Sequence, residues 1–291
     1  MSNVDPLAEL TASNIVIVAG KGGVGKTTVT AVLARAAADA GQRVLVIELD
    51  GKRALAELVP DLDVRSISAA DSLEEYLYEH GFKRIAKRLA STGVIDVIGT
   101  AAPGIDDLVV LGKIKQLERS NQWDLIVVDG PAAGHAITFL TSASGLLDAV
   151  RGGPVRDQAQ DVLDMLRDPR RCQVLLVTLP EATPVNELIE TWAALEARVG
   201  VDLASIVVNQ ADLGDPLPDP DQIDFGRART QIDDALAAAD FRRTHLAVQA
   251  AELERLTSEV PLPQIHLSAR PVAGLSSADI AALAEELVRW R

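Results

Sequence analysis

One glycine-rich stretch carries most of the chemistry that this sequence predicts. Residues 20–28 read Gly-Lys-Gly-Gly-Val-Gly-Lys-Thr-Thr and fit the pattern G-x-x-x-x-G-K-[ST], which is typical of phosphate-binding loops. In such a loop the backbone N–H groups turn inward around a phosphate, and the N-terminus of the following helix adds partial positive charge. The residues expected to contact the phosphates are Gly20, Gly22, Gly23, Val24, Gly25, Lys26, Thr27 and Thr28.

Three side chains of this loop have separate expected tasks. Lys26 should reach the β- and γ-phosphates of a nucleotide, and Thr27 should bind Mg²⁺. Lys21 follows the first glycine and is not required by the general pattern. It is either a solvated charge of the loop or a second catalytic lysine.

The segments around the loop are those that must position it. Apolar runs at 14–19 and 43–48 predict strands, and the run at 29–40 between them predicts a helix. This order forms a right-handed βαβ unit with the loop at the carboxyl end of the first strand. The alternation continues along the chain and favours an α/β fold with a doubly wound, mostly parallel sheet. Strands are expected at 14–19, 43–49, 94–98, 123–129, 172–178, 203–209 and 262–267, and helices at 27–40, 72–90, 105–119, 134–150, 155–167, 183–198, 219–238, 241–258 and 276–289.

Length and charge place limits on the function. The chain has 291 residues, of which 48% are hydrophobic, and this is enough for one large α/β domain. We expect a leader at 1–13 and a single phosphate-loop domain at 14–291, with a short helical insertion around 140–171. The net charge of −14 disfavours binding to nucleic acid or anionic lipid. A cytoplasmic protein is expected, because we find neither a signal sequence nor an apolar run of the about 20 residues that span a membrane.

An aspartate stands where a Mg²⁺ ligand is expected. The run 124–129, Asp-Leu-Ile-Val-Val-Asp, predicts a buried strand that ends at Asp129. A carboxylate at the tip of such a strand lies near the Mg²⁺ ion and its waters in phosphate-loop proteins. Asp129 is therefore predicted to hold the metal through a water molecule.

Two segments together resemble a known superfamily. The loop with its additional Lys21 is similar to the deviant phosphate loops of MinD, ParA, the nitrogenase iron protein and the ArsA-type ATPases. Residues 129–140, Asp-Gly-Pro-Ala-Ala-Gly-His-Ala-Ile-Thr-Phe-Leu, resemble the switch II segment of the ArsA-type family, D-T-A-P-T-G-H-T-L-R-F-L, although Thr138 stands where that family often has arginine. The runs Pro-Gly at 103–104, Gly-Lys-Ile-Lys at 112–115 and Gly-Gly-Pro at 152–154 look similar to an actinobacterial ArsA-like subgroup, whose members can occur as paired, non-identical subunits.

The resemblance implies a Mg²⁺-dependent ATPase that works as a homodimer or as a heterodimer with an ArsA-like paralogue. The additional lysine of such loops crosses the dimer interface, so Lys21 is expected to act on the ATP of the partner. Gly134 and His135 are expected to couple the nucleotide state to the shape of the protein, with His135 as a switch element and not as a catalytic base. Neither the client nor the pathway follows from these residues.

The same resemblance implies two further site residues. Asp50, at the end of the second expected strand, should orient the attacking water, unless it only caps the helix that follows. The family usually continues with Pro-Ala-His, whereas this chain has Gly-Lys-Arg at 51–53. Asn209, in the run Val-Val-Asn-Gln, should read the edge of the adenine through its amide, unless it is only a turn residue at the end of a strand.

Three other functions can be weighed from the residue types. Cys172 is the only cysteine, so one chain cannot supply the thiolates of an arsenite site or a zinc site, and we interpret it as a buried apolar residue.

A MinD- or ParA-like positioning protein is the first alternative. Against it, Asp279 and Glu285 flank the apolar face of the last expected helix, which is more typical of a helix packed on the sheet than of one on a membrane. A subunit that binds the nucleotide without hydrolysing it is the second alternative.

Overall fold

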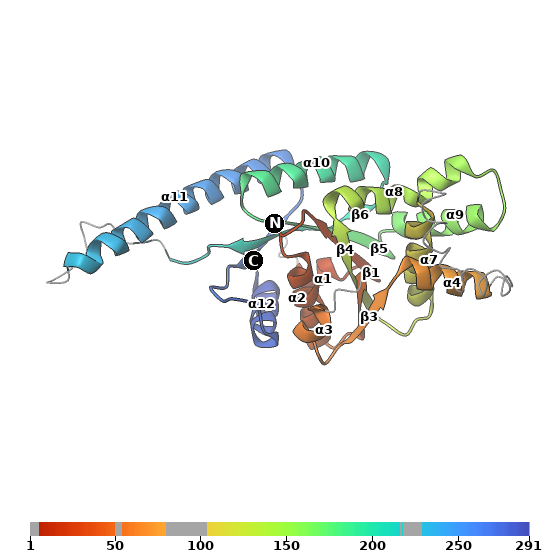
Figure 1. The fold of residues 1–291 in the computed structure, drawn as a ribbon, viewed down its shortest axis with the longest axis horizontal. Helices are drawn as coiled ribbons and strands as arrows, with labels where there is room; N and C mark the ends of the chain where they lie inside the picture. Colours follow the sequence, from red (N-terminus) through yellow and green to blue (C-terminus); the bar gives the residue numbers. More distant parts are fainter. Residues whose placement is uncertain (1–5, 50–53, 80–103, 216, 218–228, 291) are drawn as a thin grey trace.

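A parallel sheet of eight strands forms the centre of the molecule (Figure 1). The computed structural model describes residues 6–49, 54–79, 104–215, 217 and 229–290. Within these residues every strand pairing is parallel, and the strand order is β3-β2-β4-β1-β5-β7-β8, with β6 beside β5. The expected α/β fold with a mostly parallel sheet is therefore confirmed. The strands are β1 Ile15–Gly20, β2 Val44–Leu49, β3 Asp63–Ile67, β4 Leu125–Ala132, β5 Cys172–Thr178, β6 Asp202–Leu203, β7 Ile206–Ala211 and β8 Gln264–Ser268.

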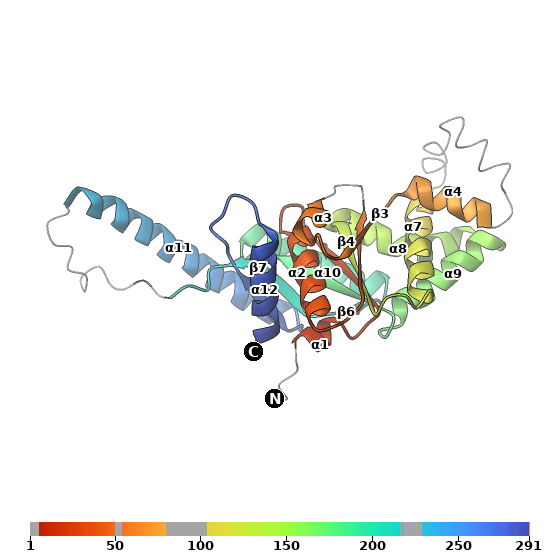
Figure 2. The ribbon, with the colours of Figure 1, turned by 90° about the horizontal axis from the view of Figure 1, so that it is seen from below.

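Helices cover both faces of this sheet (Figures 1 and 2). Side chains of α1, α2, α3 and α12 form one hydrophobic core with the sheet, and side chains of α7, α8, α9, α10 and the end of α11 form the other. Helix α4 packs on the outside of α7. The described helices are α1 Pro6–Leu10, α2 Lys26–Asp39, α3 Ala54–Leu58, α4 Ala69–Glu79, α7 Ile105–Arg119, α8 Ala133–Ala149, α9 Pro154–Arg167, α10 Ala182–Arg198, α11 Arg229–Glu259 and α12 Ser277–Arg289.

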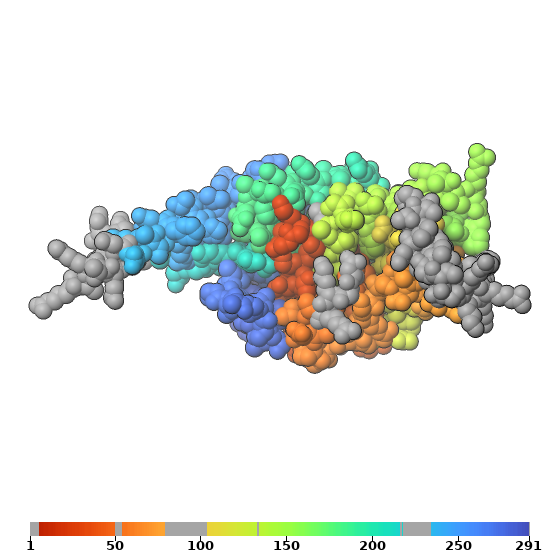
Figure 3. Space-filling model, viewed as in Figure 1, coloured from red at the N-terminus to blue at the C-terminus, as the bar shows by residue number. Residues whose placement is uncertain are grey.

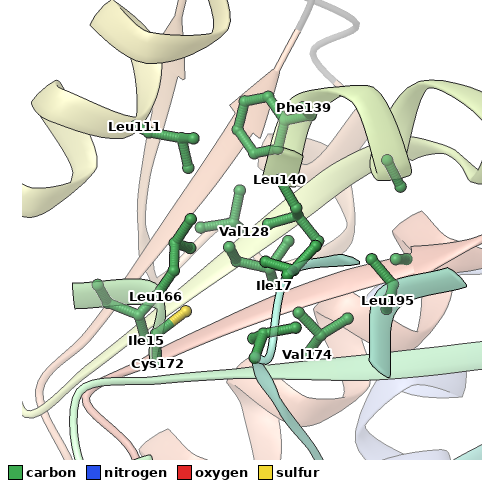
Figure 4. Packing of buried hydrophobic residues seen from close by; sticks show 14 of the residues in the cluster. Ile15, Ile17, Leu111, Val128, Phe139, Leu140, Leu166, Cys172, Val174 and Leu195 are labelled. Carbon is green, nitrogen blue, oxygen red and sulfur yellow. The ribbon is translucent and has the colours of Figure 1, made fainter. Parts of the chain in front are cut away.

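Strand β1 serves both cores, because successive side chains of a strand point to opposite faces of the sheet. Ile15 and Ile17 belong to the core on the side of α8, and Figure 4 shows Ile17 close to Leu140 of that helix. Val16 and Val18 belong to the core on the side of α2. A strand buried on both faces has to be apolar at each position, and this explains the continuous apolar run before the glycine-rich loop.

The structure departs from the expected elements at several places: α1 and α3 were not expected as helices, and β4 continues beyond Asp129 to Ala132. Strand β3 is not among the expected strands, because Asp-Val-Arg-Ser-Ile at 63–67 contains no apolar run, and only Ile67 of this edge strand is buried. The prediction of separate helices at 219–238 and 241–258 is wrong for the described residues, since α11 runs unbroken from Arg229 to Glu259 across the expected break. Neither glycine nor proline interrupts α11, so nothing local ends the helix. The strand expected at 94–98 lies outside the described residues.

The first part of α11 extends away from the sheet (Figures 1 and 3). Arg242 attaches it to the segment after β7, because its Nε and Nη2 atoms donate to the two carboxylate oxygens of Asp212 at 2.7 and 2.8 Å. These hydrogen bonds lower the pKa of Asp212 to about 2. Gln249 supports the attachment, since its amide bonds the backbone N–H and the backbone carbonyl of Asp212. Phe241, on the extending part, is 76% exposed.

Helix α1 lies within the residues expected to form a leader and packs onto the sheet. Its Leu10 side chain is fully buried in the core shared by α2 and α12. The side-chain amide of Gln173 on β5 donates to the Leu10 carbonyl at 2.6 Å, and the Ser205 hydroxyl donates to the Glu9 carboxylate. These contacts join residues 6–10 to the hydrophobic core of the domain.

The buried position of Leu10 leads to a stability prediction. Leu10→Ala should lower the free energy of unfolding by about 2–5 kcal/mol, because it removes buried methyl groups and leaves a cavity. Urea denaturation followed by circular dichroism measures this change. Ala8 is exposed on the same helix, so Ala8→Gln is a matched control that should change the stability by less than about 0.5 kcal/mol. A Leu10→Ala protein as stable as the control would show that α1 is not held by the core.

Candidate functional site

The glycine-rich loop joins the end of β1 to the start of α2, and two of its glycines are required by their surroundings. A Cβ atom at Gly20 would lie 2.4 Å from the carbonyl oxygen of Val177 on the neighbouring strand β5. Gly25 has a φ of 88°, and a Cβ atom there would lie 2.1 Å from Nδ2 of Asn209. Only glycine avoids both the close contact and the unfavourable backbone at position 25. The loop is therefore held tightly against β5 and β7.

The buried side chain of Asn209 supports the glycine-rich loop through a hydrogen bond. It is 3% exposed, and its Nδ2 atom donates to the backbone carbonyl of Val24 at 2.9 Å. This contact explains why a buried amide stands at this position, because a buried polar group has to be hydrogen-bonded. The contact seen is thus with the loop, and the expected contact with adenine stays a prediction.

The two lysines of the loop point in different directions. The Lys26 ammonium donates to the backbone carbonyl of Lys21 at 3.0 Å. The Lys21 ammonium donates to the carboxylate of Glu187 on α10, at 2.7 Å. Glu187 is not among the residues predicted for the site, because no sequence motif connects two positions that are 166 residues apart. The different partners of the two ammonium groups are consistent with separate tasks for the two lysines.

Thr27 and Asp129 come together as their positions in the sequence suggest. The Thr27 hydroxyl donates to the Asp129 carboxylate at 2.8 Å, and Asp129 is 7% exposed. A hydroxyl and a carboxylate are the hard oxygen donors that Mg²⁺ prefers, and Mg²⁺ usually takes only one or two protein ligands beside phosphate and water. The donor set therefore fits the ion, although within the described residues no group of three His, Cys, Asp or Glu side chains is placed to hold a metal.

A cleft of about 720 Å³ opens above the loop, a size typical of small-molecule sites. Its polar lining includes Lys26, Thr27 and Asp129, and its apolar lining includes Leu49 and Phe139. Asp106 and Asp107, in the first turn of α7, also line it and were not predicted, because no motif surrounds them. The lining residues are Gly22, Gly23, Gly25, Lys26, Thr27, Leu49, Ile67, Ala69, Asp106, Asp107, Val110, Asp129, Gly130, Pro131, Ala132, His135 and Phe139.

The remaining predicted residues lie at or next to this cleft, with one exception. His135 lines it, and Gly134 precedes His135 in the first turn of α8. Thr28 follows Thr27 in the first turn of α2, directly behind the loop. Asp50 lies outside the described residues and follows Leu49, the last residue of β2.

Two other regions bear on the alternatives considered above. Cys172 is fully buried at the start of β5, as expected, and burial raises the pKa of its thiol to about 12. The apolar face of α12 is buried too: Ile280 and Leu283 pack in the core beside α2. This packing confirms that the face is covered by protein. Among the described residues, the helices are either too short or too polar to cross a bilayer.

Comparison with known proteins adds a family relationship. The family model described as anion-transporting ATPase matches residues 13–151. The ATPase BagA of Mycobacterium tuberculosis is 32% identical over an alignment of 236 residues, with 72% of this chain and 68% of that protein covered. An arsenical pump-driving ATPase of Escherichia coli is 29% identical over an alignment of 214 residues, with 70% of this chain and 36% of that protein covered. An arsenical pump-driving ATPase of Acidiphilium multivorum is 29% identical over 225 residues, with 74% and 38% coverage. The match with this chain therefore covers just over a third of the length of each of these two pump ATPases.

The crowding at Gly25 leads to a prediction on binding. Gly25→Ala should weaken the binding of MgATP by at least about tenfold, because the new methyl group displaces Asn209 and a left-handed backbone is unfavourable for alanine. Calorimetric titration measures the affinity. Gly41 also has a φ of 89° but has open space around it, so Gly41→Ala introduces the same backbone penalty away from the loop. If both variants bind MgATP like the unaltered protein, the loop is not the nucleotide site.

Proposed function

The chain belongs to the ArsA-type ATPase family, and on this basis we propose that it hydrolyses ATP to ADP and phosphate as a Mg²⁺-dependent, nucleotide-switched dimer. The observation that carries the proposal is the hydrogen bond between Thr27 and Asp129, next to Lys26, in the lining of the cleft. It joins β4 to the start of α2, directly behind the glycine-rich loop. We also propose that residues 14–291 form one ATPase domain, with the helices around 140–171 as its insertion, and that it works in the cytoplasm.

Lys26 and the start of α2 are proposed to bind the β- and γ-phosphates. The Lys26 ammonium would exchange its hydrogen bond to the Lys21 carbonyl for stronger hydrogen bonds to charged phosphate oxygens. The backbone N–H groups of the first turn of α2 point toward the N-terminal end of the helix and can add donors at the same place. The tight packing of Gly20 and Gly25 supports this proposal, because it keeps the loop backbone close to the cleft.

Thr27 and Asp129 are proposed to hold Mg²⁺, Thr27 directly and Asp129 through water. When bound, the ion neutralises charge on the phosphates and orients them for in-line displacement. The present contact of 2.8 Å between the two side chains keeps both donors at one point of the cleft. Because Asp129 is buried on a central strand, its carboxylate has little freedom to move away.

Asp50 is proposed to orient the attacking water. In the reaction, the water oxygen bonds to the γ-phosphorus while the bond from that phosphorus to the oxygen kept by ADP breaks, and the water releases a proton. The residue before Asp50, Leu49, lines the same cleft as Lys26 and Thr27, and this supports the proposed role. Gly134 and His135 would couple the presence of the γ-phosphate to the position of α8, which begins directly after β4.

A dimer is proposed because Lys21 is expected to act on the nucleotide of a partner chain, either a second copy or an ArsA-like paralogue. Lys21 is partly exposed and the adjacent Gly22 and Gly23 are exposed, so a second chain can approach the loop. The buried thiol of Cys172 supports a function without arsenite or zinc bound to cysteine, although some relatives carry the name arsenical pump-driving ATPase. The client is left open by these residues.

Two substitutions test the proposed function. Lys26→Ala should abolish measurable MgATP binding, because a charged donor to the phosphates is lost. Asp50→Asn should keep the affinity and lower the turnover by at least about 100-fold, since the shape is kept while the carboxylate that orients water is removed. Calorimetry and steady-state phosphate release measure the two effects, and Asp240→Asn on the extending part of α11 is the control that should alter neither.

Three results would contradict the proposal. Unchanged affinity in Lys26→Ala would remove the phosphate role of this lysine. Unchanged turnover in Asp50→Asn would remove the water-orienting role of the carboxylate. Tight MgATP binding by the unaltered protein without any phosphate release would favour the alternative of a non-hydrolysing subunit.

A further inference from the structure

An ion pair ties the loop to helix α10 of the same chain. The Lys21 ammonium lies 2.7 Å from Oε1 of Glu187, and the two side chains are 32% and 40% exposed. The backbone of Lys21 is held as well, through the hydrogen bond from Lys26 to its carbonyl. Both the direction of the Lys21 side chain and the position of its backbone are thus set by contacts within one chain.

Glu187 stands on a firmly fixed backbone. Its neighbours Val185 and Leu188 are buried in the core between α10 and the sheet. The carbonyl of Glu187 accepts a hydrogen bond from the Thr191 hydroxyl at 2.6 Å. The flexible partner of the pair is therefore Lys21, whose ammonium group sits on four rotatable bonds.

We propose that Glu187 is a positioning residue that holds Lys21 against its own chain, so that Lys21 reaches the nucleotide of a partner only when this ion pair opens. This inference rests on the proposed function, in which Lys21 acts across the dimer interface. The phosphates of a nucleotide carry more negative charge than one carboxylate and offer more acceptors, so they can take the ammonium from Glu187. The pair is partly exposed, which makes it weak enough to exchange.

If Glu187 holds Lys21 against its own chain, removing the Glu187 charge should promote the action of Lys21 on a partner. Glu187→Gln removes the competing charge, so the unaltered Lys21 should engage a partner more readily. The protein concentration that gives half of the maximal specific ATPase activity should fall by about two- to fivefold, the range expected for a partly exposed ion pair. In a Lys21→Ala background the same substitution should have no effect, because the pair no longer exists.

The first experiment tests the pair without any nucleotide. The rate at which acetic anhydride acetylates Lys21 is measured by mass spectrometry in the full chain. Glu187→Gln should raise this rate severalfold, because the ammonium loses its partner. Glu190 is exposed on the same helix, three residues further on, and Glu190→Gln removes the same charge without touching the pair. Equal acetylation rates in the two variants would overturn the inference.

The second experiment measures phosphate release against protein concentration for the unaltered chain, Glu187→Gln, Glu190→Gln, Lys21→Ala and the double variant Lys21→Ala with Glu187→Gln. A lower half-maximal concentration in Glu187→Gln alone, absent from the double variant, supports the inference. A higher half-maximal concentration, no change, or a change that persists without Lys21 overturns it.

These variants distinguish a failure of the proposed role of Glu187 from a failure of the proposed dimer function. If Lys21→Ala keeps full turnover and the same concentration dependence, the proposed role of Lys21 across a dimer is wrong. If the unaltered chain stays monomeric and inactive with MgATP, the proposed homodimer is wrong, and this inference falls with it. If Lys21→Ala is impaired as proposed but Glu187→Gln behaves like Glu190→Gln, only the role of Glu187 is wrong.

Discussion

The site depends on the register of β1 beside β4. In this register Val18 lies opposite Asp129, and the loop that leaves β1 returns Thr27 to within 2.8 Å of the Asp129 carboxylate. A shift of one residue would turn the side chains of β4 to the other face of the sheet, and Asp129 would no longer face the loop. The register is set by apolar side chains that must enter two different cores. The packing of the sheet therefore places the pair of oxygen donors.

The fixed and the adjustable parts of the site lie in different places. Helix α2 packs on the sheet with α12 beside it on the same face, so Lys26 and Thr27 stand on a backbone that cannot shift easily (Figure 2). By contrast, the Lys21 side chain is partly exposed and held by one ion pair to Glu187. A nucleotide-binding switch needs this combination, because a rigid floor keeps the phosphates in place while weakly held groups change partners.

The fold and the residues of the loop could be read from the sequence because their signals are local. An apolar run predicts a buried strand, and the glycine pattern is contained within nine residues, 20–28. Strand β3 could not be read, because an edge strand needs few apolar side chains. Glu187 and the acidic turn at 106–107 could not be predicted as site residues for another reason, since they join the site only through tertiary packing. Asn209 was predicted from a resemblance, whereas its hydrogen bond to Val24 comes from the geometry of the loop.

The central claim is that Thr27 and Asp129 form a Mg²⁺ site for a nucleotide bound at residues 20–28. The most direct measurement is the calorimetric affinity for ATP with Mg²⁺ and with EDTA, in the unaltered protein and in Asp129→Asn. The account predicts that Mg²⁺ tightens binding by at least about tenfold in the unaltered protein, and that most of this gain disappears in Asp129→Asn, because a carboxylate holding the ion is lost. Equal affinity with and without Mg²⁺, or a full Mg²⁺ effect in Asp129→Asn, would contradict it.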